Sequence, residues 1–179
     1  LHKTLSQSPW RSAYRRVLAL MLSKSAQKVQ DALSKLGNAY EVIEAAESTR
    51  TAEEAAARVG CSVGQIVKSL VFKGKKSGKA ILILTSGVNR VDVKRIAFYT
   101  EEKIGRADPD FVRERTGFAI GGIPPLGHLH PIETYVDEDL LNFEEIWAAA
   151  GTPKAVFKMR ASELEKMTGG KIIQVKQEF

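Results

Sequence analysis

The most distinctive chemistry in the sequence lies in one segment, GFAIGGIPPLGHLHP, at residues 117–131. It contains four glycines, three prolines and two histidines. Glycines allow close approach to the backbone and prolines fix φ, so the stretch Gly121–Pro125 predicts a rigid loop with bare N–H groups. An oxyanion or a carbonyl oxygen requires such groups. A plain tight crossover explains the same residues, and the lack of a following Gly-Lys-Ser/Thr argues against a phosphate-binding loop.

The histidines and the cysteine offer weaker chemistry. His128 and His130 form an HxH pair that could ligate zinc, but the sequence offers no evident third ligand. Cys61 is the single cysteine, which excludes an internal disulfide and a cysteine-based zinc cluster. Its place beside Gly60 is typical of a small buried residue, and no GxSxG motif indicates a serine hydrolase. The sequence therefore predicts neither a metal nor a cofactor.

Lys68 is the most informative charged residue. In the stretch QIVKSLVF it interrupts an apolar run at the predicted junction of a helix and a strand. A lysine is costly there unless its amine reaches a partner, a cavity or solvent, so a site residue and a snorkelling lysine both fit. Asn89, Arg90 and Asp92 follow the end of the next strand. Asp92 also suits a helix N-cap, which alone would explain it.

The elements that must position these residues alternate along the chain. Apolar spacing and capping signals predict helices at residues 25–36, 52–60, 62–69, 92–99, 143–151 and 162–169, and one that begins at residue 108. Strands are predicted at residues 39–44, 70–74, 80–85, 154–159 and 171–176, with a strand and turn at 132–141. The second and third strands form a hairpin. Interleaved helices and strands that include a hairpin favour an α+β fold with a mixed sheet over a doubly wound parallel one.

Positive charge is concentrated at the start of the chain. The net charge is +6, yet residues 1–30 carry six basic residues and no acid, so the remainder is neutral overall. Residues 1–22 form a basic extension, which fits a transit-like segment, an upstream or expression-derived extension before Met21, or an added helix. Residues 68–115 carry twelve basic and six acidic residues, so a nucleic-acid-binding face competes with a solvated surface. No run is long enough to span a membrane.

Five segments, taken in their order and spacing, resemble one known family. They are STRTAEEAA, QIVKSLVF, SGVNRVDVKR, TGFAIGGIPPLGH and AAGTPKAVFKM. Together they are similar to the YbaK and prolyl-tRNA synthetase-associated (ProX-like) editing family over about residues 23–175. The resemblance implies an editing domain at residues 23–179, with an α+β fold in which short helices surround a mixed, partly barrel-like sheet. It also implies hydrolysis of the ester that joins a wrong amino acid to a tRNA.

The same resemblance implies roles for individual residues. Lys68 matches the family's essential lysine, which helps hold the substrate near the terminal adenosine, and Gly121–Pro125 matches its GxxxP loop, whose backbone contacts the aminoacyl end. We therefore expect catalytic roles for Lys68 and Gly121. Expected substrate-binding residues are Gly122, Ile123, Pro124, Pro125, His128, Asn89, Asp92, Gly151 and Thr152. Expected tRNA-binding residues are Lys73, Lys75, Lys76, Arg90, Lys94 and Arg95.

The activity that the resemblance implies is that of a free-standing, cytoplasmic, trans-acting aminoacyl-tRNA deacylase. An aminoacyl ester is already activated, so a positioned water and a stabilised oxyanion suffice, which agrees with the lack of a triad or metal motif. The leading substrate is tRNA(Pro) carrying alanine, cysteine or serine, recognised at its acceptor end, with prolyl-tRNA synthetase as a candidate partner. The alternatives are a non-catalytic RNA-binding or regulatory module of the same fold and a hydrolase of another small aminoacyl ester.

Overall fold

The computed structural model describes residues 21–178. Residues 1–20 and 179 lie outside the described part, and with them most of the basic extension predicted at residues 1–22. None of the helices within residues 21–178 has the length and the apolar content that a bilayer crossing requires.

A mixed β-sheet organises the fold. Its strands are β1 (Val42–Glu44), β2 (Ile66–Gly74), β3 (Ala80–Ser86), β4 (Ile104–Arg106), β5 (Glu133–Asp137), β6 (Glu145–Ala149), β7 (Ala155–Arg160) and β8 (Lys171–Ile173). Seven of them lie in the order β1-β7-β6-β2-β3-β5-β8, and β4 pairs with the far end of β2. β2 is antiparallel to β3 and parallel to β6. The predicted α+β class with a mixed sheet is confirmed.

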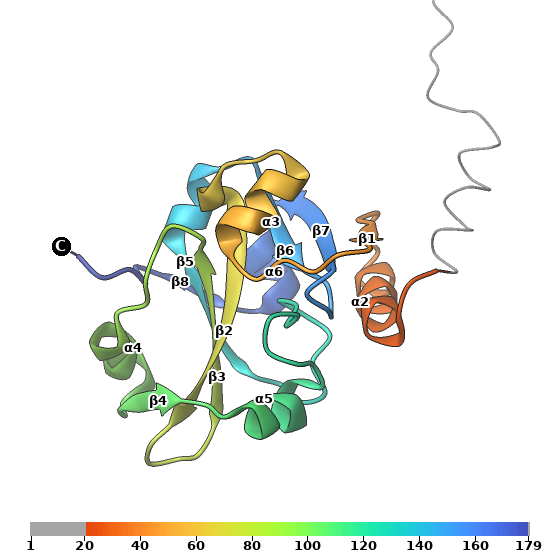
Figure 1. The fold of residues 1–179 in the computed structure, drawn as a ribbon. Helices are drawn as coiled ribbons and strands as arrows, with labels where there is room; N and C mark the ends of the chain where they lie inside the picture. Colours follow the sequence, from red (N-terminus) through yellow and green to blue (C-terminus); the bar gives the residue numbers. More distant parts are fainter. Residues whose placement is uncertain (1–20, 179) are drawn as a thin grey trace, which may run out of the picture.

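Short helices surround the sheet (Figure 1). They are α2 (Lys24–Lys35), α3 (Ala52–Val59), α4 (Val93–Thr100), α5 (Pro109–Thr116) and α6 (Leu164–Thr168), with 3-10 turns at Val63–Gln65, Glu138–Asn142 and Ala161–Glu163. The predicted starts of α3 and α5 agree with the structure, because the side chains of Thr51 and Asp108 accept hydrogen bonds from first-turn N–H groups. Ser23, which was not predicted as a cap, does the same for α2. Gly60 ends α3 in the left-handed conformation.

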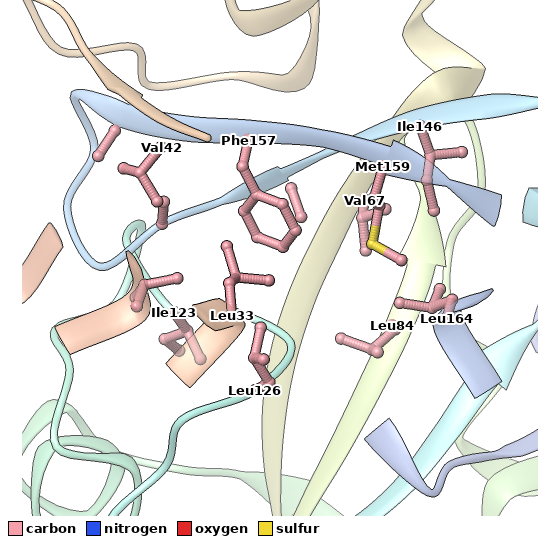
Figure 2. Packing of buried hydrophobic residues seen from close by; sticks show 14 of the residues in the cluster. Leu33, Val42, Val67, Leu84, Ile123, Leu126, Ile146, Phe157, Met159 and Leu164 are labelled. Carbon is pink, nitrogen blue, oxygen red and sulfur yellow. The ribbon is translucent and has the colours of Figure 1, made fainter. Parts of the chain in front are cut away.

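The central strand β3 is buried on both faces of the sheet, and its side chains alternate between the two. In β3, Leu84 points into one apolar cluster and Ile83 into the other. The first cluster includes Leu33 of α2 and Phe157 of β7, which Figure 2 shows close together with loop residues. The second includes Ile96 of α4. The two helices therefore cover opposite faces, with the β2–β3 hairpin between them (Figure 1).

One predicted helix is wrong. Residues 143–151 were expected to be helical, but residues 145–149 form β6, between β2 and β7. Alanines favour helix locally, whereas Ile146 and Ala148 are buried in alternation with the less buried Glu145 and Trp147, as a strand requires. Pairing on both sides overrides the local propensity.

The position of Lys68 also differs from the prediction. The helix predicted at residues 62–69 is only the 3-10 turn Val63–Gln65, and β2 begins at Ile66. The β-branched Ile66 and Val67 pair in parallel with Trp147 and Ala148 of β6. Lys68 thus lies inside a strand and not at the junction of a helix and a strand. The short strand β4 was not predicted, because three residues carry too little pattern.

Candidate functional site

A row of polar residues crosses three neighbouring strands on one face of the sheet. Lys68 of β2 lies opposite Thr85 of β3 in the antiparallel register. The side chain of Thr85 donates a hydrogen bond of 2.9 Å to Asp137 Oδ2 at the end of β5. Because neighbouring residues on paired strands share a face, Lys68, Thr85 and Asp137 lie side by side. The row is on the face that α4 covers, because Tyr135 and Ile83, two residues before Asp137 and Thr85, belong to the same apolar cluster as Ile96 of α4.

The carboxylate of Asp137 is the centre of this row. Its side chain has no exposure to solvent. Besides Thr85, Oδ2 accepts hydrogen bonds from Ser86 N at 3.0 Å and from Asn89 Nδ2 at 2.8 Å, and Oδ1 accepts one from Asp139 N at 3.1 Å. A buried carboxylate is costly unless donors surround it, and these donors offset its desolvation.

Asn89 links the carboxylate to Lys68. Its amide nitrogen is fixed by Asp137 and by Asp139 Oδ2, each at 2.8 Å. Its backbone oxygen accepts a hydrogen bond of 2.5 Å from Lys68 Nζ. An ammonium has three donors, and within residues 21–178 Asn89 O is the one hydrogen-bond acceptor on Nζ. An ammonium that is fixed in position and has unused hydrogen-bond donors is suited to binding an oxygen atom of a substrate.

The surroundings of Lys68 act on its charge in opposite directions. Burial lowers the pKa of the Lys68 amine, and the positive charge of Arg90 lowers it further. The carboxylates of Glu53 and Asp137 oppose this by favouring the charged amine. Glu53 comes from α3, Arg90 from the loop after β3 and Asp137 from β5, so three separate elements set the electrostatics of one amine.

The GGIPP loop, residues 121–125, packs against the turn that follows β6. Gly151 N donates a hydrogen bond of 2.8 Å to Gly122 O. A Cβ on Gly122 would lie 2.6 Å from Thr152 Cα, so only glycine permits this approach. Gly121, by contrast, is exposed and has φ +92°. The loop and the Gly151–Thr152 turn, which were predicted to share a site, do meet.

The remainder of the loop is anchored in the core. Ile123 and Leu126 are 3% and 6% exposed and belong to the cluster that contains Leu33 (Figure 2). Pro124 and Pro125 are buried as well. The prolines and the apolar anchors together fix the backbone of the loop before any ligand arrives.

His128 supports the GGIPP loop through a hydrogen bond to its backbone. Its Nε2 lies 2.7 Å from Pro124 O. A carbonyl oxygen can only accept, so Nε2 carries the proton of the neutral ring. Burial lowers the pKa of His128, and the hydrogen bond to Pro124 opposes this only in part. His128 therefore acts as a neutral brace on the loop, whereas His130 is exposed.

The Lys68 amine and the GGIPP loop lie at the same end of the sheet but on opposite faces. Val67 shares the core cluster with Ile123, so Lys68, the next residue along β2, points to the opposite face. Val67 is also opposite Ala148 in the parallel pair, which puts Lys68 a few residues from the turn at Gly151. Among residues 21–178 no hydrogen bond or ion pair joins Lys68 to the loop.

The predicted tRNA-binding residues form two groups and not one. Lys73, Lys75 and Lys76 lie at the far end of the β2–β3 hairpin, whereas Arg90, Lys94 and Arg95 lie in the loop after β3 and the first turn of α4. Lys73 Nζ is engaged over the ring of Phe111 at 4.8 Å. At about 3.3 Å per residue, Lys73 is roughly 17 Å along β2 from Lys68. The two groups therefore lie at opposite ends of the β2–β3 hairpin.

Several predicted residues have structural duties. Asp92 Oδ1 caps α4 by accepting from Lys94 N and Arg95 N at 3.0 and 3.2 Å. Thr152 Oγ1 accepts from Lys154 N at 3.2 Å. Burial raises the pKa of the Cys61 thiol, which disfavours the thiolate that a nucleophile needs. Within residues 21–178 no group of three or more His, Cys, Asp or Glu could hold a metal ion.

Sequence reasoning missed the acidic part of the site. Asp137 and Asp139 lie in the strand and turn predicted at residues 132–141, and neither was named as a site residue. No periodic signal marks Asp137, because residues 134–137 of β5 are all buried whichever face they point to. Lys176, which contacts Asp139 at 2.8 Å, comes from a segment distant in sequence and carried no local signal.

Comparisons with known proteins agree on one kind of domain. A family model described as "Aminoacyl-tRNA editing domain" matches residues 46–167, which include Lys68, the GGIPP loop and the Gly151–Thr152 turn. "Uncharacterized protein YwhH" of Bacillus subtilis (strain 168) is 33% identical over 132 residues, covering 74% of this chain and 83% of that protein. "Putative Cys-tRNA(Pro)/Cys-tRNA(Cys) deacylase EbsC" of Enterococcus faecalis (strain ATCC 700802 / V583) is 25% identical over 130 residues, covering 72% and 79%.

A solved structure agrees in fold. It is titled "Crystal structure of a putative trans-editing enzyme for prolyl tRNA synthetase" and is 50% identical to this chain. The two superimpose with a TM-score of 0.83, over 88% of this chain and 99% of the other.

The contact between the loop and the turn can be tested at Gly122. Gly122→Ala places a methyl group against the backbone of Thr152, which cannot move aside as a flexible side chain can, so we expect a loss of about 1–3 kcal/mol in the free energy of unfolding. Gly105→Ala is the matched control, since its Cβ would meet mainly the mobile end of Lys75. Urea unfolding measures both. Equal stabilities of the two variants would contradict the close packing of the loop.

The brace at His128 predicts a pH dependence. Because the folded pKa of His128 is lowered, the unfolded chain takes up the proton first as the pH falls below about 6.5. The stability advantage of the wild type over His128→Asn should therefore shrink between pH 7.5 and pH 5.5. Urea unfolding at both pH values measures it, with His130→Asn as the control. An advantage that grew as the pH fell would show that the folded state favours the charged ring.

Proposed function

Because the chain belongs to the aminoacyl-tRNA editing domain family, we propose that it is a trans-acting deacylase that hydrolyses the ester between a wrong amino acid and its tRNA. The observation that carries the proposal is the ammonium of Lys68, held on Asn89 O at the end of the sheet where a rigid glycine loop meets the Gly151–Thr152 turn. A fixed cation and a fixed backbone are what an activated ester needs.

In the proposed reaction, water attacks the carbonyl carbon of the aminoacyl ester. The bond from carbon to the ribose oxygen breaks, and the proton of the water passes to that oxygen. Lys68 binds an oxygen of the ribose or of the ester, and the exposed backbone at Gly121 faces the developing oxyanion. Gly122–Pro125, His128, Asn89, Asp92, Gly151 and Thr152 form or support the walls of the substrate site. No step requires a covalent nucleophile.

We propose tRNA(Pro) with a small amino acid as the substrate, recognised at its acceptor end in the cytoplasm. Support comes from the names of two similar proteins, "Putative Cys-tRNA(Pro)/Cys-tRNA(Cys) deacylase EbsC" and the "putative trans-editing enzyme for prolyl tRNA synthetase". Alanine, cysteine and serine are the amino acids to test. Prolyl-tRNA synthetase is the proposed protein partner.

The enzymatic proposal is tested at Lys68. Lys68→Met keeps the apolar stem and removes the amine, and we expect kcat/KM to fall about 100-fold, as for the loss of an oxyanion donor. The measurement is deacylation of tRNA(Pro) charged with alanine, cysteine or serine, with correctly charged Pro-tRNA(Pro) as the substrate control. If the wild type deacylates none of them faster than Lys68→Met, the protein is a binding module or acts on another ester.

The hairpin tip is tested separately. Lys75 and Lys76 are exposed, and we propose that they contact phosphates. Lys75→Ala combined with Lys76→Ala should raise KM about fivefold at physiological salt, leave kcat nearly unchanged and weaken the salt dependence of binding. Lys158→Ala combined with Lys166→Ala, two exposed lysines elsewhere, is the charge-matched control. Equal KM values for the two double variants would remove the hairpin tip from the RNA interface.

A further inference from the structure

We propose that Asp139 and Lys176 are positioning residues for Lys68 and that they act by holding Asn89. This inference rests on the proposed function, because it concerns the Lys68 amine, which we propose binds an oxygen of the ribose or of the ester. Lys176 lies outside the residues matched by the family model, 46–167. The chain of contacts runs from Lys176 through Asp139 and Asn89 to Lys68.

Each step of the chain is a direct contact. Lys176 Nζ lies 2.8 Å from Asp139 Oδ2, and the same oxygen accepts a hydrogen bond of 2.8 Å from Asn89 Nδ2. The backbone oxygen of Asn89 then accepts the 2.5 Å hydrogen bond from Lys68. The side chain of Asn89 and its carbonyl group belong to one residue, so fixing the amide fixes the acceptor of the Lys68 amine.

The loop that carries Asn89 has little packing on its outer side. An open cavity of about 630 Å³ is lined there by Val88, Asn89, Arg90, Lys176, Gln177 and Glu178. Val88 is 66% exposed. On the inner side Gly87 is closely packed, since a Cβ there would lie 2.3 Å from Val63 O. Polar contacts must therefore hold the outer half of the loop, where apolar packing is lacking.

The C-terminal segment, residues 174–178, supplies these contacts. Its backbone is tied to the chain just after Asn89, because Asp92 N donates to Val175 O and Gln177 N donates to Arg90 O, both at 2.9 Å. Val91 and Lys176 form an isolated antiparallel bridge. These contacts fix the register of the segment and place Lys176 beside Asp139.

Charge makes the outer contact stronger than a neutral one. Hydrogen bonds from Lys176 and Asn89 lower the pKa of Asp139, and the Asp139 carboxylate raises the pKa of Lys176. Both groups are therefore ionised at neutral pH. The Asp139 side chain is 22% exposed, so the pair is screened less than a fully exposed one. Without Lys176, the carboxylates of Asp137 and Asp139 would face each other across one amide.

The test compares two lysines that each form an ion pair. Lys176→Met removes the cation of this chain, and Lys158→Met removes that of the Lys158–Glu145 pair, which is 2.9 Å long and lies on β7 and β6. We expect Lys176→Met to lower kcat for deacylation about tenfold with KM changed less than twofold, and Lys176→Arg to restore at least half of the wild-type kcat. Lys158→Met should retain wild-type kcat and KM. Thermal unfolding of each variant verifies that it is folded at the assay temperature.

A double-mutant cycle separates positioning from a general structural effect. If Lys176 acts through Lys68, Lys176→Met should have no further effect on the single-turnover rate in the Lys68→Met background. An equal loss in both backgrounds would overturn the inference, and so would a kcat of Lys176→Met equal to that of Lys158→Met. Each of those outcomes leaves the proposed function intact as long as Lys68→Met is slow. If the wild type and Lys68→Met are equally slow, the proposed function itself fails.

Discussion

A carboxylate without contact to water, that of Asp137, determines the geometry at one end of this sheet. Its oxygens accept hydrogen bonds from β3, from the loop after β3 and from the 3-10 turn after β5. An ionised group in such a place is unfavourable unless every donor stays in position. The need to satisfy Asp137 therefore constrains the neighbouring backbone, including the carbonyl group of Asn89 that holds the Lys68 amine.

The rest of the candidate site depends on apolar packing instead. On the other face of the sheet, the GGIPP loop is held by Ile123 and Leu126 in the main core cluster and by the close approach of Gly122 to Thr152. One half of the site is thus fixed by hydrogen bonds to a buried carboxylate, and the other half mainly by apolar packing, together with the hydrogen bonds from Gly151 and His128 to the loop. Both halves meet at the end of the sheet where β2 and β6 run parallel, so the sheet is the common frame for two different kinds of rigidity.

The sequence was sufficient where a local signal and the tertiary structure agree. Caps at Thr51 and Asp108, the β2–β3 hairpin and the mixed sheet followed from residues a few positions apart. The prediction failed at β6, whose alanines favour a helix until β2 and β7 pair with it. Asp137 and Lys176 were missed for a related reason. The burial of Asp137 depends on residues that are near it only in the folded structure, and Lys176 comes from residues 174–178, far from Asp139 in sequence. The site roles carried over from the family stay predictions.

The wall formed by Gly122 and the Gly151–Thr152 turn consists of main-chain atoms. Gly122 O accepts from Gly151 N, and Gly151 in turn lies so close to Ser25 O of the α2 entry that a Cβ there would be 2.5 Å away. Substitutions change side chains and leave main-chain atoms in place, so this wall offers almost nothing for natural variation to reshape. In the proposed substrate site, a change in the size of the ligand would therefore have to come from the surrounding side chains, because the main-chain wall stays the same.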